Sequence, residues 1–311
     1  MKILILGAGG VGGYFGGRLA EAGADVTFLV RERRAAQLAE NGLVVRSKFG
    51  DIERPVQTVL RDTIPGPFDV VILTCKAYDL EDAMDAIAPA VGEGTKIVPL
   101  LNGLAHMDAL DARFGADKVL GGVCHISATL SPEGEVRHLN PMQVVTVGDR
   151  SGGACEAGAT IAAFLKDTPV KVVESDTIAL SMWEKFVMLT SLAANTCLMR
   201  ASVGDIMETA EGEAIVLETV AECARVAEAS GFPPRDKVLA QAKTFQTETG
   251  SPVSASMLRD IEKGGPTEGK HIVGDMVERA KAQGIATPNL RLALCHLQAY
   301  ENRRIREAGK G

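Results

Sequence analysis

Seven glycines lie within eleven residues near the start of the chain. Three of them, Gly7, Gly9 and Gly12, have the spacing G-x-G-x-x-G and directly follow the apolar residues 3–6. Between a strand and a helix, this motif is typical of a turn that holds the pyrophosphate of a dinucleotide. The first glycine allows the tight turn, the second lets the backbone approach the phosphates, and the third packs the helix close to the strand. The alternative is a glycine-rich turn that binds no ligand.

The helix that follows this turn is expected to bind the phosphates as well. A helix N-terminus offers free N–H donors and a partial positive charge, so Gly10 and Val11 are predicted to contact the cofactor together with the three motif glycines. Gly16 and Gly17 lie further along the same helix and are expected to serve its packing.

The residues after the second expected strand decide which dinucleotide binds. An acidic residue there holds the ribose hydroxyls of NAD, whereas an arginine accommodates the 2′-phosphate of NADP. Arg31 follows the strand at 25–30, and Arg33 and Arg34 come close behind. Glu32 lies about where an acidic residue would be expected. We predict NADP through Arg31, and NAD through Glu32 remains the alternative.

The first half of the chain alternates strands with helices. Strands are predicted at 2–6, 25–30, 69–74 and 96–101, and helices at 11–22, 32–40 and 80–90. Short apolar strands separated by helices predict a doubly wound parallel sheet that is buried on both faces. Residues 119–147 then predict two antiparallel strands around the turn "SPEGEV", followed by a helix at 155–166 and a strand at 170–173.

From about residue 176 onward the pattern is helical. Helices are predicted at 177–199, 205–230, 234–247, 254–262, 266–284 and 288–306. Because a single core usually stops growing at about 250–300 residues, a chain of 311 residues is expected to form two domains. We place an α/β domain at 1–175 and an all-helical domain at 176–311.

Composition excludes several classes of protein. A net charge of -7 provides no basic surface for nucleic acid or for an anionic membrane. No uncharged apolar run reaches the length of a membrane span, and the first residues are too short for a signal peptide. The six cysteines form no C-x-x-C pair, and the dispersed histidines predict no metal site. We therefore expect a cytoplasmic protein with reduced thiols.

Three polar residues stand where chemistry is plausible. Lys76 and Asn102 each follow a predicted parallel strand, and open α/β sheets bind ligands at the carboxyl ends of such strands. Each could instead be an ordinary surface or turn residue. Lys185 lies in the apolar helical stretch "SMWEKFVMLTSL", where the alternative to a functional role is a lysine that extends from the edge of the core to solvent.

Five blocks of sequence carry a resemblance to a known family. They are "ILGAGGVGGYFGGRLAEAGADVTFLVR", "TCKAYD", "LLNGL", "WEKF" and "SMLRDIEKGGPTE". In their order and spacing they resemble the ketopantoate reductase (2-dehydropantoate 2-reductase) family over nearly the whole chain. The resemblance implies a Rossmann domain that binds NADPH and a helical domain that closes over it. It also implies reduction of the ketone of a 2-oxo acid and a possible homodimer.

The resemblance also implies a role for each matching residue. Arg31 is expected to bind the 2′-phosphate, while Lys76 and Asn102 face the cofactor side of the site. Lys185 is expected to be the catalytic acid, which supplies the proton and the positive charge that the forming alkoxide needs. Ser256 and Glu268 are expected to bind substrate together with Asn102, and Glu268 is counted as catalytic as well.

The sequence departs from the family pattern around the expected substrate. Typical members carry asparagines one and two turns after the acid lysine, where this chain has Leu189 and Ala193. Val253 replaces a further asparagine, and Gly269 with Lys270 replaces the usual Ile-Asp. These changes predict a pocket that is less polar or differently shaped. They leave three alternatives: a ketopantoate reductase, a related dehydrogenase for another oxo acid, and a non-catalytic NADP-binding sensor.

Overall fold

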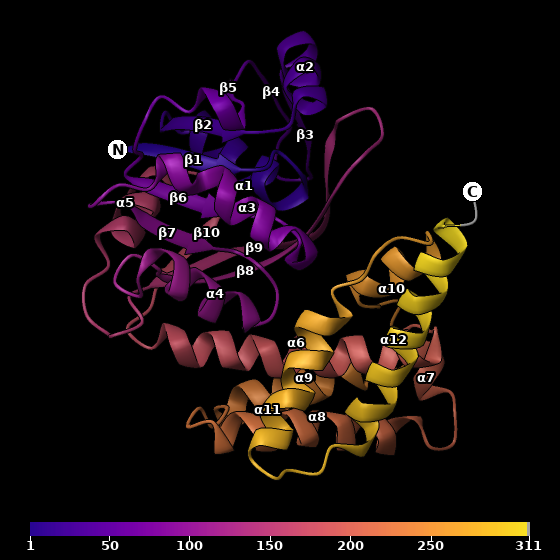
Figure 1. Cartoon of the computed structure of the whole chain (residues 1–311). Coiled ribbons are helices and arrows are strands. Elements are labelled where there is room, and N and C mark those ends of the chain that lie inside the picture. Colours follow the sequence, from indigo (N-terminus) through magenta and orange to yellow (C-terminus); the bar gives the residue numbers. More distant parts are fainter. Residues whose placement is uncertain (310–311) are drawn as a thin grey trace. The chain divides into compact units, whose positions relative to one another are not determined.

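The computed structural model describes residues 1–309, which fall into two compact units (Figure 1). The first unit comprises residues 1–101 and 107–178. The second joins residues 102–106 to the chain from Ala179 onward. A short segment between two elements of the α/β half therefore belongs to the helical unit, which the sequence pattern gives no reason to expect.

The first unit is built on a five-stranded parallel sheet (Figure 1). Its strands, in spatial order, are β5 (Gln57–Val59), β2 (Asp25–Leu29), β1 (Lys2–Leu6), β6 (Val70–Leu73) and β7 (Lys96–Pro99). The chain runs outward from β1 to β2 and β5, and then returns to β6 on the other side of β1. Such a reversal of strand order marks the point where open α/β sheets bind ligands. The predicted doubly wound, Rossmann-type fold is thus confirmed.

The other elements of this unit are helices and a mixed second sheet. The helices are α1 (Gly10–Glu21), α2 (Glu32–Asn41), α3 (Leu80–Ile87), α4 (Ala105–Phe114) and α5 (Glu156–Leu165). The second sheet contains β3 (Leu43–Arg46), β4 (Ile52–Arg54), β8 (Gly121–Leu130), β9 (Val136–Gly148) and β10 (Lys171–Glu174). Strands β8 and β9 pair antiparallel, as the sequence predicts.

Helix α1 packs between the two sheets because it presents glycine to both. A Cβ at Gly16 would lie 2.5 Å from Ile5 Cδ1 of the parallel sheet, and one at Gly17 would lie 3.0 Å from Leu43 Cδ2 of the mixed sheet. Atoms added at such short distances would force neighbouring groups to move. Overpacking of this kind typically destabilises the folded state by about 1–3 kcal/mol. These glycines serve packing, and they bring the start of α1 close to the end of β1.

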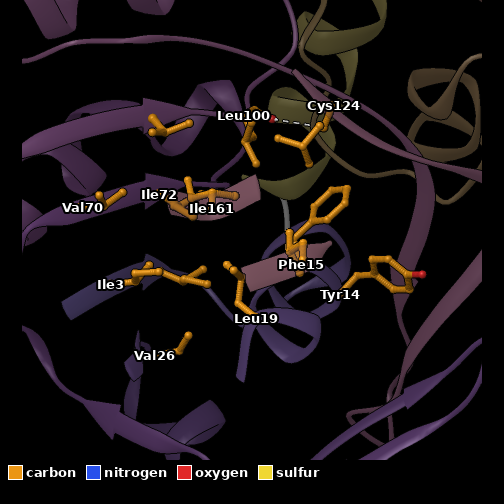
Figure 2. Packing of buried hydrophobic residues seen from close by; sticks show 14 of the residues in the cluster. Ile3, Tyr14, Phe15, Leu19, Val26, Val70, Ile72, Leu100, Cys124 and Ile161 are labelled. Carbon is orange, nitrogen blue, oxygen red and sulfur yellow. Dashed lines mark hydrogen bonds between the residues drawn. The ribbon is translucent and has the colours of Figure 1, made fainter. Parts of the chain in front are cut away.

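The larger residues of α1 fill the core on either side of these glycines. Figure 2 shows Phe15 and Leu19 in one buried cluster with Ile3, Ile72 and Ile161, which come from β1, β6 and α5. The cluster includes residues of both sheets, so the two sheets share one core. Tyr14 is also buried, and its hydroxyl donates a hydrogen bond to Gln143 Oε1.

The second unit is helical (Figure 1). Its main elements are α6 (Ile178–Met199), α7 (Val203–Met207), α8 (Gly212–Ala229), α9 (Asp236–Gln246), α10 (Ser256–Glu262), α11 (Asp275–Ala282) and α12 (Pro288–Ala308). The single helix expected at 205–230 is in fact α7 followed by α8. A capping box between Ser202 and Asp205 starts α7, and the turn that follows brings Gly212 against the backbone of Ile206.

A π-helical turn, η4 (Lys270–Gly274), precedes α11. The sequence predicts one helix over 266–284, but regular α-helix begins only at Asp275. Turns of this kind are rare and occur frequently at functional sites.

Candidate functional site

The glycine-rich turn after β1 has the shape that a phosphate group needs. Gly7 has φ +93°, a left-handed conformation that favours glycine, and its N–H donates to Leu29 O at 2.9 Å. A Cβ at Gly12 would lie 2.5 Å from Thr74 Oγ1, so the start of α1 could not approach β6 as closely with a side chain there. Gly9 differs from both, because nothing lies within 4 Å of its would-be Cβ. A glycine at position 9 therefore keeps open space above the backbone.

The first turn of α1 supplies backbone N–H donors beside that open space. Gly9 is the N-cap of α1 and provides no side-chain acceptor for the first N–H groups. Those groups and the helix dipole suit an anion. Gly10 has a packing role too, since a Cβ there would lie 2.6 Å from Ala128 O on β8. Val11 is partly buried at the second helical position.

A cavity of about 750 Å³ opens at this edge of the parallel sheet. It is lined by the glycine-rich turn, the end of β2, the start of α2, the face of α3 and the hairpin between β8 and β9. Its residues include Gly7, Gly9, Arg31, Glu32, Arg33, Arg34, Arg61, Asp62, Thr74, Cys75, Asp79, Asp82 and Ser131. The cavity is large enough for a cofactor-sized ligand, and its glycines, free N–H groups and arginines fit the phosphates of a dinucleotide.

Arg31 lines this cavity, and its side chain is 77% exposed. One of its terminal nitrogens lies 3.1 Å from Asp82 Oδ2 and 3.5 Å from Asp79 Oδ1. The hydrogen bond to Asp82, with the nearby charge of Asp79, raises the pKa of Arg31 above its usual value. Arg31 is thus a charged and accessible cation whose present partners are carboxylates.

Arg34 has a different task, which the sequence alone did not reveal. Its guanidinium donates to Ala8 O at 2.9 and 3.1 Å, and to Gly134 O at 2.9 Å. It therefore ties the glycine-rich turn to the hairpin between β8 and β9. Partial burial lowers the pKa of Arg34. Glu32 and Arg33 are exposed beside it, and both line the cavity.

Lys76 lies just beyond β6, as expected, but outside the cavity lining. It is the partly buried N-cap of a short 3₁₀ turn, η2 (Ala77–Asp79), whose last residue has its N–H bonded to Lys76 O at 2.9 Å. The residue before it, Cys75, does line the cavity.

Asn102 and Lys185, 83 residues apart in the sequence, meet in the helical unit. Lys185 Nζ donates to Asn102 Oδ1 at 3.1 Å, and Lys185 is partly buried on α6. The residue after Asn102 lies close against the π-helical turn. Gly103 has φ +82°, and a Cβ added to it would lie 2.9 Å from His271 O. Any side chain at position 103 would disturb this approach. The π-helical turn therefore helps to position the partner of Lys185.

Glu268 is buried two residues before that turn begins. The segment leading to it is fixed by α12: Glu301 accepts the N–H of Thr267 at 2.6 Å, and the Tyr300 hydroxyl donates to Gly265 O at 2.7 Å. Burial lowers the pKa of His271 and outweighs the opposing effect of the Glu268 charge.

Ser256 is the first residue of α10 and is partly buried. The preceding Ala255 donates its N–H to Thr196 Oγ1 on α6 at 3.3 Å, which fixes the start of α10 in the same unit as Lys185.

The residues that depart from the family pattern are apolar in the structure as well. Leu189 and Ala193 follow Lys185 at intervals of one helical turn on α6, so the three share one face of the helix. Leu189 is partly buried and Ala193 is fully buried. Val253 is partly buried, and its carbonyl accepts the N–H of Val203 at 2.8 Å.

Across residues 1–309, no group of three or more His, Cys, Asp or Glu side chains is arranged to hold a metal ion. In the same part of the chain, no helix combines the length and the apolar character needed to cross a membrane.

Comparison with known proteins assigns the chain to a family. Residues 3–152 match the model of ketopantoate reductase PanE/ApbA, and residues 177–301 match the model of its C-terminal domain. YkpB of Bacillus subtilis, described as an uncharacterized oxidoreductase, is 35% identical over 97% of this chain and 99% of its own.

Solved structures agree with this assignment. The 2-dehydropantoate 2-reductase of Geobacter metallireducens is 29% identical, with a TM-score of 0.87 over 96% of this chain and 99% of its own. D-mandelate dehydrogenase, solved with NADH and anilino(oxo)acetate, is 25% identical, with a TM-score of 0.86 over 98% of this chain and 99% of its own. The chain therefore belongs to the ketopantoate reductase PanE/ApbA family and is an oxidoreductase.

Proposed function

We propose that this protein uses NADPH to reduce a 2-oxo acid to a 2-hydroxy acid. The observation that carries the proposal is the hydrogen bond from Lys185 Nζ to Asn102 Oδ1 at 3.1 Å. It joins the one lysine expected to act as an acid to an amide that can orient it. Similarity to a 2-dehydropantoate 2-reductase and to D-mandelate dehydrogenase supports the reaction class.

In this proposal the first unit binds the cofactor. The turn of Gly7, Gly9 and Gly12 and the first N–H groups of α1, from Gly10 and Val11, hold the pyrophosphate. Arg31 pairs with the 2′-phosphate, and Lys76 and Asn102 are assigned to the nicotinamide side of the cofactor. When bound, the nicotinamide supplies the hydride. The rest of the chemistry belongs to the residues of this chain.

Lys185 provides the proton. As a ketone carbon is reduced, negative charge grows on its oxygen, and a nearby ammonium both stabilises that charge and neutralises it by proton transfer. A lysine ammonium has three N–H donors. The bond to Asn102 uses one of them and fixes the direction of the others. Asn102 is therefore both a positioning residue for Lys185 and a candidate contact for the substrate.

Ser256 and Glu268 are assigned to the substrate. Ser256 offers a hydroxyl at the start of α10. Glu268 is a buried carboxyl group that α12 holds in place through the preceding Thr267. In the same proposal Glu268 acts with Lys185 in catalysis, as an acceptor that orients a hydroxyl or ammonium group.

The substrate is proposed to be less polar than ketopantoate. Leu189 and Ala193 lie on the face of α6 that carries Lys185, and neither can hydrogen-bond a hydroxyl group. The neighbouring structure of D-mandelate dehydrogenase, which was solved with an aromatic oxo acid analogue, favours an oxo acid with an apolar side chain. A ketopantoate reductase remains the second candidate.

The catalytic role of Lys185 is tested by Lys185→Ala. Turnover of any accepted 2-oxo acid should fall by about 10²–10⁴-fold, which is the usual contribution of a general acid. The Kd of NADPH should stay within a few fold, because the proposed phosphate-binding residues are untouched. Steady-state kinetics and a fluorescence titration measure the two effects.

A matched control for Lys185 is Lys243→Ala, which removes an exposed lysine on α9 of the same unit. It should leave turnover and NADPH binding unchanged. If Lys185→Ala retains normal turnover, or if it loses NADPH affinity in parallel, the lysine has a structural role.

Cofactor choice is tested by Arg31→Ala. The unmutated protein should bind NADPH more tightly than NADH, and the substitution should weaken NADPH binding about tenfold while NADH changes less than twofold. A charged hydrogen bond contributes about 1.5–3 kcal/mol, and solvent exposure places this one at the lower end. Calorimetric titration of both cofactors gives the ratio.

Arg113→Ala serves as the matched arginine control, since Arg113 is exposed, pairs with Asp85 and does not line the cavity. This substitution should not change the ratio of the Kd for NADPH to the Kd for NADH. Equal affinities in the unmutated protein, or tighter binding of NADH, would assign cofactor choice to Glu32 instead.

Substrate class is tested with a panel of 2-oxo acids that differ in side chain. An aryl or branched alkyl side chain should give at least a tenfold higher kcat/KM than ketopantoate, because no amide at position 189 or 193 can bind a hydroxyl group. Leu189→Asn should reduce the difference in kcat/KM between these substrates and ketopantoate. Efficient ketopantoate reduction by the unmutated protein would show that the two asparagines are not needed.

A further inference from the structure

Two arginines at the rim of the cavity share one carboxylate. Asp82 on α3 lies 3.1 Å from Arg31 through one oxygen and 3.0 Å from Arg61 through the other. Arg61 belongs to a 3₁₀ turn, η1 (Arg61–Thr63), which follows β5. All three residues line the cavity and have side chains that are about half exposed or more. They form a small charged cluster that solvent or a ligand can reach.

Neighbouring carboxylates distinguish the two arginines. Asp79 lies 3.5 Å from Arg31. Asp85 lies 3.8 Å from Arg61 and 3.1 Å from Arg113, and it is not part of the cavity lining. Among the carboxylates of residues 1–309, Asp82 is the one whose ion pairs join Arg31 to Arg61, so it occupies donors that a ligand phosphate on this rim would need from both.

We propose that Asp82 is a specificity-determining residue that competes with the 2′-phosphate of NADPH for Arg31 and Arg61, and that Arg61 is a second contact for this phosphate. The inference rests on the proposed function, because it assumes that a dinucleotide binds in this cavity.

Binding of NADPH at this rim would exchange one anion for another. A 2′-phosphate that pairs with Arg31 must take N–H donors from Asp82, and it also meets the repulsion of that carboxylate. NADH has no phosphate on this ribose and places no charge near Asp82, so Asp82 changes its affinity little. Asp82 therefore makes the ratio of NADPH affinity to NADH affinity smaller than it would be if both arginines were free of carboxylates.

Asp82→Asn tests the competition because asparagine keeps the size of the side chain and removes its charge. Calorimetric titration of the full-length protein should show a Kd for NADPH that is about three- to tenfold lower, with the Kd for NADH changed less than twofold. Adenosine 2′,5′-bisphosphate and AMP should show the same contrast. The gain should shrink as salt concentration rises, since exposed charges are screened.

Two further variants complete the test. Asp85→Asn removes an equally exposed carboxylate that touches Arg61 but not Arg31, and it should change both affinities less than twofold. Arg61→Ala in the Asp82→Asn background should reverse most of the NADPH gain.

The inference is wrong if Asp82→Asn leaves the NADPH affinity unchanged, or if it weakens NADPH binding because Asp82 orients the arginines. Failure of the unmutated protein to bind either cofactor would overturn the proposed function as well. The two failures are therefore distinguishable.

Discussion

The first unit depends on how closely helix α1 approaches the strands on both of its sides. A Cβ at Gly12, Gly13 or Gly16 would come within 2.7 Å of an atom of the strands or their adjoining loops, so the helix can lie between two sheets only because these positions have no side chain. This packing fixes the N-terminus of α1 against the end of β1. The same short stretch of chain therefore packs against the core on its buried sides and leaves open space at Gly9.

The arginines around the cavity differ in the partners that they bind. Arg34 donates three hydrogen bonds to backbone carbonyl groups. These bonds hold the glycine-rich turn and the β8–β9 hairpin together. Arg31 and Arg61 instead pair with exposed carboxylates that a ligand can displace. Three arginines of one cavity thus have two functions, and burial separates them. The partly buried Arg34 is structural, and the more exposed Arg31 and Arg61 are available to an anion.

Much of the first unit could be predicted from the sequence because its signals are local. The strands β1, β2, β6 and β7 are apolar runs next to glycine or charged turns, and each is found within a few residues of its expected place. Strands β3, β4 and β5 were not predicted. They have only three or four residues each, too few for alternation to be visible. Strands β3 and β4 pair with each other, but the partner of β5 and the second partner of β3 are distant in sequence.

The contacts that organise the candidate site are non-local, and the sequence could not reveal them. Family resemblance singled out Asn102 and Lys185 separately, but only the fold brings them to 3.1 Å. Residues 102–106 belong to the helical unit, where Gly103 lies close to a π-helical turn far along the chain. The pairing of Asp82 with two arginines likewise requires α3 to lie beside the ends of β2 and β5.

The division of the glycine-rich stretch into ligand-facing and core-facing positions is tested most directly by NADPH titration of Gly9→Val. Nothing lies within 4 Å of the added Cβ, so the variant should still fold, with a midpoint of thermal unfolding lowered only by the weaker N-cap that valine provides. NADPH affinity should nevertheless fall at least a hundredfold, because the side chain occupies the space that the phosphates need. Unchanged NADPH binding by this folded variant would contradict the account.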